Sequence, residues 1–357
     1  MKISFLIPTF GSGGAERTIE YVASYMANCG HDVEIISITN TKFYDPDKRV
    51  KFVTMDVDGH YRNILGRIAN IVKRYYRIGK HIKKSQPDVV CCLLPETAKF
   101  VLSLCKKKKI KLITSERNNP ALDGNSSLKN KIFEKSDGII FQTERAREWY
   151  PERIRSKGVV IHNAVGNKLV YDVPEQRNTV KTVSAVGRLS PQKDYPTMLR
   201  AFKLVLDKHS DFVLNIFGKG ADLGALTALA SELGISEKVV FKGECRDAIM
   251  QIADSACYVM SSAYEGMPNA LMEAMAIGLP CVSTDCPNGP AELINSGKNG
   301  LLVPVGDAKA LADAICKMID DRDFAKTCGE NAKKILEDHS IPQIAKKYTD
   351  YIESICG

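Results

Sequence analysis

Short apolar segments that run into glycine-containing loops occur in both halves of this 357-residue chain, and they restrict it to an α/β fold. Residues 2–8 have the composition of a buried strand, residues 11–17 contain three glycines, and a helix with apolar residues at helical spacing follows. Residues 182–186 run in the same way into a glycine loop and a helix. Residues 87–94 are almost continuously apolar, as parallel strands buried on both faces require. With 44% hydrophobic residues, the chain is expected to form two such domains.

The segment from Ser262 to Pro280 is expected to form a loop, a short helix and a strand. Gly266 and Pro268 are turn residues, so the helix should begin at Asn269 or Ala270. The first N–H groups of such a helix have no partner inside the helix and attract anions. This segment is therefore the first candidate for a phosphate-binding site.

Charged side chains near these loops favour a ligand that contains both a diol and a diphosphate. Glu265 lies just before the predicted helix and Glu273 about one turn inside it, and carboxylate oxygens accept hydrogen bonds from neighbouring hydroxyls. Arg188 and Lys193 follow the predicted strand 182–186, where a planar guanidinium and a mobile ammonium can neutralise a departing diphosphate. The alternative is that all four are solvated surface charges.

Three motifs resemble those of the family-four retaining glycosyltransferases, which have the GT-B fold. One is Glu-Gly-x-Pro-x-x-x-x-Glu-Ala-x-Ala-x-Gly-x-Pro, which begins at Glu265, and another is Gly-Arg-Leu-x-x-x-Lys, which begins at Gly187. The third is Gly-Gly-x-Glu, which ends at Glu16, whereas a dinucleotide fingerprint would need its third glycine at that position. The resemblance extends over essentially the whole chain. It implies two Rossmann-like β/α/β domains that face each other across a cleft.

The resemblance also implies where the domains begin and end. Residues 1–165 would form the acceptor-binding domain, to which residues 341–357 return as a crossing helix, and residues 166–340 would bind the nucleotide sugar. Residues 167–181 are polar and aperiodic, as a linker should be.

Roles for individual residues follow from the same resemblance. Three residues would be catalytic: Arg188 and Lys193 would stabilise the leaving diphosphate, and Glu265 would orient the sugar. Glu273 would bind the ribose. The implied donor-binding residues are Gly14, Gly187, Gly218, Gly243, Gly266, Met267, Pro268, Asn269 and Glu273. The acceptor or cleft candidates are Glu16, Glu116, Arg117 and Asn118.

Arg117 departs from the family pattern, because related transferases often have Ser-Glu-His-Asn where this chain has Ser-Glu-Arg-Asn. A histidine-assisted step is therefore not expected. The arginine could stabilise the leaving diphosphate or bind an anionic acceptor, and the alternative is a surface salt bridge with Glu116.

Positive charge is concentrated in the first half of the chain. Residues 1–165 contain 29 Lys and Arg against 17 Asp and Glu, a balance of +12, and the remainder has a balance of −4. A one-sided basic domain indicates a polyanionic partner, either a nucleic acid or an anionic membrane surface. Because no nucleic-acid-reading module is recognisable, we expect the membrane and no nucleic acid.

Two basic segments are the candidates for membrane contact. The first runs from Arg62 to Lys84, has eight Lys and Arg and no acid, and places isoleucines and Tyr75 on one helical stripe. The second runs from Lys106 to Lys111. Packing of the apolar stripe on the domain's own sheet, with the lysines merely solvated, is equally compatible with the pattern. Both can hold at once, with the apolar side inward and the cationic rim near lipid headgroups.

The sequence gives only weak indications of metal sites, disulfides or targeting segments. Eleven cysteines occur without a C-x-x-C pair, which favours a reducing, cytoplasmic setting, and no segment has the length of a signal peptide or membrane span. The acidic pairs Asp45/Asp47 and Asp56/Asp58 could hold a divalent ion in a GT-A enzyme. Since two similar halves favour GT-B, we expect no metal and no cofactor, with a UDP-sugar as co-substrate.

The sequence thus favours a retaining transferase that is peripheral on the cytoplasmic face of the membrane. It would move a sugar, with GalNAc or GlcNAc preferred, from a UDP donor to a lipid-linked glycan acceptor. A UDP-galactose or UDP-glucose hexosyltransferase, a nucleotide-sugar epimerase or hydrolase, and a non-catalytic binding subunit are the alternatives.

Overall fold

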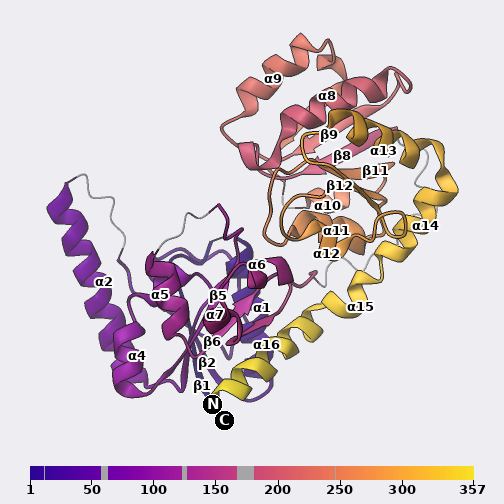
Figure 1. Cartoon of the computed structure of the whole chain (residues 1–357). Helices are drawn as coiled ribbons and strands as arrows, with labels where there is room; N and C mark the ends of the chain where they lie inside the picture. The colour runs from indigo at the N-terminus through magenta and orange to yellow at the C-terminus, as the bar shows by residue number, and fades with distance from the viewer. Residues whose placement is uncertain (12, 58–62, 123–126, 167–180, 246) are drawn as a thin grey trace. The chain divides into compact units, whose positions relative to one another are not determined.

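The computed structural model describes residues 1–11, 13–57, 63–122, 127–166, 181–245 and 247–357. It divides into two compact units, one formed by residues 1–164 and 341–357 and the other by residues 165–340 (Figure 1). The boundary between the units thus follows residue 164, whereas the motifs placed it after residue 165. Most of the predicted linker, together with Arg62 and Asp58, lies outside the described residues.

The first unit is a parallel sheet of seven strands in the order β3-β2-β1-β4-β5-β6-β7. Its strands are β1 (Lys2–Ile7), β2 (Asp32–Ser37), β3 (Lys51–Thr54), β4 (Val89–Cys92), β5 (Lys111–Glu116), β6 (Gly138–Phe141) and β7 (Gly158–Val160). Its helices are α1 (Gly14–Asn28), α2 (Ile64–Ser85), α3 (Pro95–Ala98), α4 (Leu102–Lys108), α5 (Ser127–Lys135), α6 (Glu144–Glu148), α7 (Glu152–Arg155) and α16 (Ile341–Cys356).

The second unit repeats this arrangement with six parallel strands in the order β10-β9-β8-β11-β12-β13. Its strands are β8 (Thr182–Val186), β9 (Val213–Phe217), β10 (Val239–Gly243), β11 (Cys257–Met260), β12 (Cys281–Thr284) and β13 (Leu301–Val303). Its helices are α8 (Tyr195–Leu206), α9 (Leu223–Glu232), α10 (Ala248–Gln251), α11 (Asn269–Ala276), α12 (Pro290–Leu293), α13 (Ala308–Asp320), α14 (Arg322–Ala332) and α15 (Ile335–His339), with 3₁₀ turns η3 (Pro191–Lys193) and η4 (Ser236–Lys238).

The central strands of each sheet are buried on both faces, which is why they are mostly apolar. In β1, Ile3 and Phe5 join the hydrophobic cluster on one face, whereas Leu6 joins the cluster on the other. In β11, Val259 and Tyr258 divide in the same way between the two clusters of the second unit. The doubly wound fold predicted from the sequence is therefore confirmed for both halves.

The last helix, α16, belongs to the first unit and packs against α1. Its buried side, which includes Ile344, Tyr348 and Ile352, joins the same cluster as β1. Tyr351 fixes the end of this contact, because its hydroxyl accepts a hydrogen bond from Ile139 N at 2.9 Å and donates one to Lys157 O at 2.6 Å. The chain thus returns to its first unit after it has completed the second.

The structure of α2 bears on the two alternatives considered for its apolar stripe. The apolar stripe does not pack inward over the whole helix, because only Ile78 and Ile82 of the stripe are buried, whereas Ile64, Ile68 and Ile71 are 74%, 53% and 45% exposed. Among the described residues, no helix is both long enough and apolar enough to cross a bilayer.

Two helical glycines provide a test of the second unit's packing. A Cβ added to Gly329 in α14 would lie 2.3 Å from Gly278 O, whereas one added to Gly224 in α9 would meet nothing within 4 Å. We expect G329A to lower the free energy of unfolding by about 1–3 kcal/mol through overpacking. G224A should raise it by about 0.5–1 kcal/mol, because alanine is the better helix former. Urea unfolding followed by circular dichroism measures both, and equal midpoints for the two variants would contradict the packing described.

Candidate active site

The candidate site of the second unit lies where its strand order reverses. Strands β8 and β11 are neighbours, although β9 and β10 intervene in the sequence. In an open parallel sheet, ligands bind at the carboxyl ends of the strands at such a switch point. The loop after β8 carries Gly187, Arg188 and Lys193, and the loop after β11 carries Glu265. The sheet thus brings together residues that are more than seventy positions apart.

An ion pair between Lys193 and Glu265 joins these two loops. Lys193 Nζ lies 2.6 Å from Glu265 Oε1, and the side chains are only 15% and 7% exposed. Ser262 Oγ donates a second hydrogen bond of 2.6 Å to the same carboxylate oxygen. A charge pair removed from water is stable only when its remaining oxygens and protons are also bonded, and the serine helps to meet this condition.

Gln192 connects the third predicted catalytic residue to this pair. Its Nε2 donates to Glu265 Oε2 at 3.3 Å and to Tyr264 O at 3.2 Å, and its Oε1 accepts from Arg188 Nη2 at 3.4 Å. Arg188, Gln192, Glu265 and Lys193 therefore form one connected chain of polar contacts, and Arg188 is its exposed end. The sequence analysis did not single out Gln192, although its place directly before Lys193 was the available signal.

Backbone contacts hold the two loops at this spacing. Ser261 Oγ donates to Lys193 O at 2.8 Å, and Ala263 N donates to Gln192 O at 2.9 Å. Tyr195 OH donates to Gly187 O at 3.1 Å. Burial, and then the negative charge of Glu265, raise the pKa of Tyr195, so that its hydroxyl remains a donor. These bonds position the charged side chains before any ligand is present.

The predicted donor-binding glycines stand in a row at the ends of adjacent strands. Gly187 follows β8, Gly218 follows β9, and Gly243 ends β10. Gly218 has φ +147°, and a Cβ there would lie 1.9 Å from Gly187 O. Gly218 N also donates to Gly243 O at 2.8 Å. Side chains would separate these strand ends, so the glycines leave the backbone accessible to a ligand.

Helix α11 begins at Asn269, as predicted. Its N-cap residue, Pro268, provides no side-chain hydrogen bond to the first turn. Met267 and Pro268 are buried, Glu273 is half-buried inside the helix, and Gly266 precedes them. The end of α11 that favours anions therefore follows directly after the loop of the Lys193–Glu265 pair.

The first unit carries Gly14 and Glu16 at the start of α1. Gly13 is the N-cap residue, and a Cβ there would lie 2.3 Å from Glu16 Oε2, so the glutamate side chain folds back over the first turn. Burial raises the pKa of Glu16, and a hydrogen bond to its own backbone and the charge of Arg117 oppose this shift.

Arg117 does not form the salt bridge with Glu116 that was considered from the sequence. Glu116 is buried and pairs with Lys129 and Tyr150, and burial raises its pKa. Arg117 instead donates to neutral oxygens: Thr18 Oγ1 at 2.8 Å, Asn163 Oδ1 at 2.7 Å and Tyr348 OH at 3.2 Å. Asn118 is exposed, and its N–H donates to Glu116 Oε1 at 3.2 Å. The guanidinium is thus held at the carboxyl end of β5 by neutral oxygens and forms no salt bridge among the described residues, although its charge also acts on Glu16.

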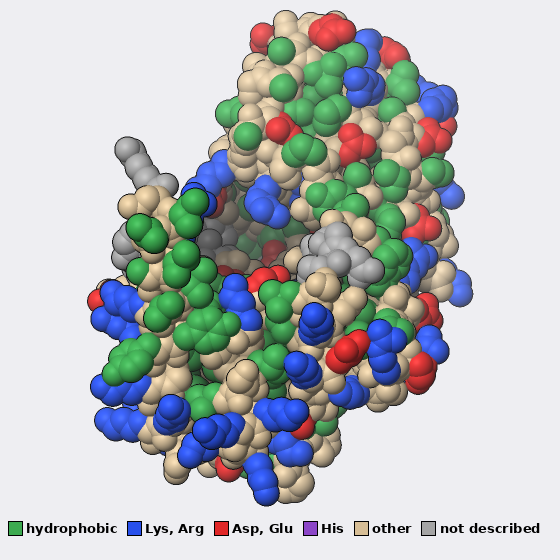
Figure 2. Space-filling view, turned by 60° about the vertical axis from the view of Figure 1, so that its left-hand side comes forward, with side chains coloured by type: hydrophobic (Ala, Val, Ile, Leu, Met, Phe, Trp, Pro, Cys, Tyr) green, Lys and Arg blue, Asp and Glu red, His purple; other side chains and the backbone are tan. Residues whose placement is uncertain are grey.

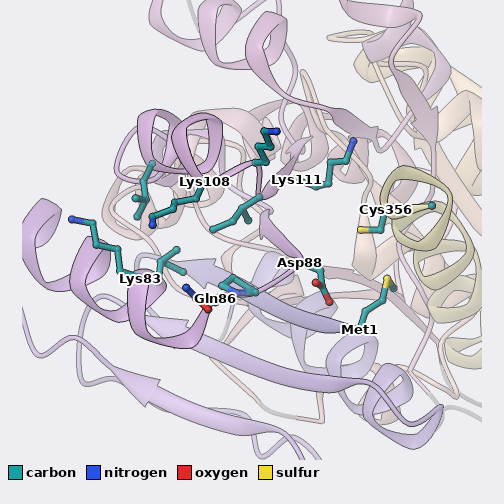
Figure 3. A pocket seen from close by; sticks show the side chains of 13 residues that line it. Met1, Lys83, Gln86, Asp88, Lys108, Lys111 and Cys356 are labelled. Carbon is teal, nitrogen blue, oxygen red and sulfur yellow. The ribbon is translucent and has the colours of Figure 1, made fainter.

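A cavity of about 610 Å³ lies at the other edge of the first sheet (Figure 3). It is lined by residues before β4 and at the start of β5, such as Asp88 and Lys111, together with Lys83 and Lys108. Because ligands of parallel α/β sheets bind at the carboxyl ends, this cavity is distinct from the edge that carries Glu16 and Arg117.

The acidic pairs considered for a metal have other partners where they are described. Asp45 Oδ1 lies 2.7 Å from Lys42 Nζ, and Asp47 Oδ1 lies 2.9 Å from Arg49 Nε. Asp56 is exposed. Within the described ranges, no three His, Cys, Asp or Glu side chains are grouped as metal ligands.

Two family models match consecutive parts of the chain. The model described as Glycosyltransferase Family 4 matches residues 12–166, and the model described as Glycosyl transferases group 1 matches residues 172–335. The boundary between the matches coincides with the region between the two units.

Individual relatives agree with these models. The chain is 26% identical over 367 residues, 99% of each protein, to the GalNAc-alpha-(1->4)-GalNAc-alpha-(1->3)-diNAcBac-PP-undecaprenol alpha-1,4-N-acetyl-D-galactosaminyltransferase of Campylobacter jejuni. It is 27% identical to an exopolysaccharide phosphotransferase of Streptomyces coelicolor, with 93% of this chain covering 38% of that protein. Anabaena Alr3699/HepE in complex with UDP and glucose has the same fold, with a TM-score of 0.81, 18% identity and coverage of 99% of this chain and 100% of that one. The chain therefore belongs to the family-four glycosyltransferases of the GT-B fold, and it is a transferase.

Proposed function

We propose that this glycosyltransferase moves a sugar from a UDP donor to a lipid-linked glycan acceptor and retains the anomeric configuration. The name of the Campylobacter relative, which covers the whole chain, supports a lipid-diphosphate acceptor and an N-acetylhexosamine donor. The UDP in the Anabaena structure supports the nucleotide. GalNAc and GlcNAc are thus preferred to galactose and glucose.

The observation that carries this proposal is the connected chain Arg188, Gln192, Glu265 and Lys193 beside the start of α11. A cation held in place at a partly buried site stabilises developing negative charge without reorganisation. The Glu265 carboxylate fixes the Lys193 ammonium, and the exposed Arg188 guanidinium offers a planar fork for phosphate oxygens. The half-buried Glu273, one turn into α11, is the residue proposed to bind the ribose.

The proposed step balances without a side-chain base. The bond between the sugar C1 and the β-phosphate oxygen breaks, and its electron pair remains on the diphosphate. The acceptor hydroxyl oxygen forms a bond to C1 on the same face, and its proton passes to the departing phosphate oxygen. Arg188 and Lys193 stabilise the diphosphate, and Glu265 orients the sugar. Backbone N–H groups at the start of α11 contribute to donor binding.

The first unit is proposed to bind the acceptor at the cytoplasmic face of the membrane. Arg117 and Glu16 lie near the carboxyl edge of its sheet, and within the described part of the chain Arg117 forms no salt bridge, although its charge acts on Glu16. A partly exposed arginine held by neutral oxygens retains its charge for an anionic ligand, such as an acceptor phosphate.

Loss of the Lys193 ammonium should slow the reaction steeply. We expect K193A to lower kcat about 100- to 1,000-fold, since one donor to a developing anion contributes on the order of 3–4 kcal/mol. Release of UDP in the presence of acceptor measures the effect. K203A is the matched control, because Lys203 is an exposed lysine of α8 paired with Asp207.

K193A also leaves Glu265 buried without its cation, so its folding must be checked by thermal unfolding. R188A provides a second route, because Arg188 is exposed and its described contact is a single long hydrogen bond. Near-normal turnover in R188A and in folded K193A would contradict the assignment.

The reaction is expected to proceed without a metal, because Arg188 and Lys193 provide the positive charge that a divalent ion would otherwise supply. Turnover in excess EDTA should equal turnover in its absence. Loss of activity in EDTA and recovery with Mg²⁺ or Mn²⁺ would overturn this part of the proposal.

A panel of UDP-sugars identifies the donor and separates the alternatives. Thermal shift should be largest for the true donor, because a ligand at about 100 times its Kd adds roughly 2.7 kcal/mol to stability. Product analysis without acceptor distinguishes the other enzymes, since an epimerised sugar or rapid hydrolysis would favour an epimerase or hydrolase. Stabilisation by UDP-glucose or UDP-galactose alone would favour the hexosyltransferase.

A further inference from the structure

The outward face of α2 carries large apolar side chains that the described residues of the first unit leave 44–77% exposed, although the Tyr75 ring meets the edge of Phe100. We define the α2 apolar face as its seven exposed members with their exposed fractions: Ile64 74%, Leu65 77%, Ile68 53%, Ile71 45%, Val72 60%, Tyr75 44% and Tyr76 66%. They lie within a single stretch of thirteen residues. Exposed apolar residues that are clustered, rather than scattered, indicate a surface that binds another apolar body.

Polar contacts on the opposite side hold the helix in this orientation. Arg77 Nη1 donates to Met55 O at 2.6 Å and to Asp56 O at 2.8 Å. His81 Nε2 lies 2.9 Å from Glu34 Oε2, and Ser4 Oγ donates to Glu34 Oε1 at 2.6 Å. Burial opposes ionisation of Glu34, but these hydrogen bonds and the charge of His81 outweigh it and lower its pKa. The helix thus turns these polar residues, together with Ile78 and Ile82 of its last turns, toward its own domain, and the apolar residues of its first turns outward.

Positive charge lies beside the α2 apolar face. Helix α2 contains seven Lys and Arg and no acid, and Lys106 to Lys109 follow at the end of the neighbouring α4. Figure 2 shows apolar side chains on this face of the first unit, with many Lys and Arg side chains below them. A helix that lies in the interface of an anionic bilayer typically has this composition. It combines an apolar side, tyrosines near the headgroups and cations beside them.

A second copy of the chain is a poorer occupant of this surface. If two copies packed through their α2 apolar faces, the seven Lys and Arg of one helix would approach the seven of the other. Neither helix contains an acid that could neutralise them. An anionic lipid surface instead supplies headgroup charges for the cations and hydrocarbon for the apolar side chains. Charge complementarity therefore decides between the two.

We propose that the α2 apolar face inserts into the headgroup region of an anionic bilayer. Because α2 follows β3 and precedes β4, its first turns stand at the carboxyl edge of the sheet, the edge that carries Glu16 and Arg117. Insertion of these turns therefore sets the candidate acceptor residues beside the lipid surface. The inference rests on the proposed function for its acceptor, but the insertion itself can be measured separately.

Sedimentation with vesicles tests the insertion. The full chain should bind vesicles of phosphatidylglycerol and phosphatidylcholine more tightly than phosphatidylcholine alone. I68S/V72S, which leaves every charge unchanged, should bind at least about tenfold more weakly, because two side chains lose their apolar transfer free energy. L223S is the matched control, since Leu223 is 44% exposed in the second unit. Equal affinity of I68S/V72S and the wild type would overturn the proposal.

Fluorescence distinguishes insertion from adsorption by charge alone. The chain has one tryptophan, Trp149, so W149F/Y76W reports only from α2. Its emission should shift to shorter wavelength with anionic vesicles and be quenched by lipids brominated on their acyl chains. Unquenched emission from vesicle-bound protein, or a concentration-dependent blue shift without lipid that accompanies dimerisation, would overturn the insertion.

Calorimetric titration with UDP separates this inference from the proposed function. I68S/V72S should bind UDP as the wild type does, because its substitutions lie in the first unit and the candidate donor site in the second. A wild type that binds vesicles but no UDP would remove the proposed function and leave the insertion standing. A wild type that binds UDP but no vesicles would overturn the insertion and leave the proposed function standing.

Discussion

A partly buried ion pair, Lys193 with Glu265, is the contact around which the candidate active site is built. An ammonium and a carboxylate removed from water are costly unless each remaining polar atom is satisfied. Ser262 and Gln192 bond the carboxylate, and Ser261 and Ala263 bond the backbone of the loop that carries the lysine. The site therefore keeps a cation in a fixed place in an environment where its field is weakly screened.

The doubly wound topology makes this contact possible. Both units use the same strand order, with their first and fourth strands adjacent, so each has one point where loops from these strands meet. In the second unit that point carries the ion pair, and the glycines after β8 and β9 leave the backbone uncovered beside it. In the first unit the same edge carries Glu16 and Arg117. One architecture thus provides both the edge proposed to bind the donor and the edge proposed to bind the acceptor.

Helix α2 departs from the usual burial of apolar residues. Its inward side is held by Arg77, His81 and the two buried isoleucines of its last turns. The apolar residues of its first turns stay exposed among the described residues of the unit. In the proposed arrangement the bilayer, and not the domain's own sheet, removes them from water.

Local patterns determined the two sheets, the helix at 341–357, the start of α11 and the loops that carry Arg188, Lys193 and Glu265, because periodicity and turn residues act over a few neighbours. Only the tertiary structure decided which side chains meet. Glu265 binds Lys193 and Gln192, Glu116 turns inward to Lys129 and Tyr150, and Arg117 finds neutral oxygens from three other segments. The sequence also left open whether the apolar stripe of α2 faces the protein or the solvent. A helical period shows that one face is apolar, but contacts with distant strands decide whether that face is turned toward the protein or away from it.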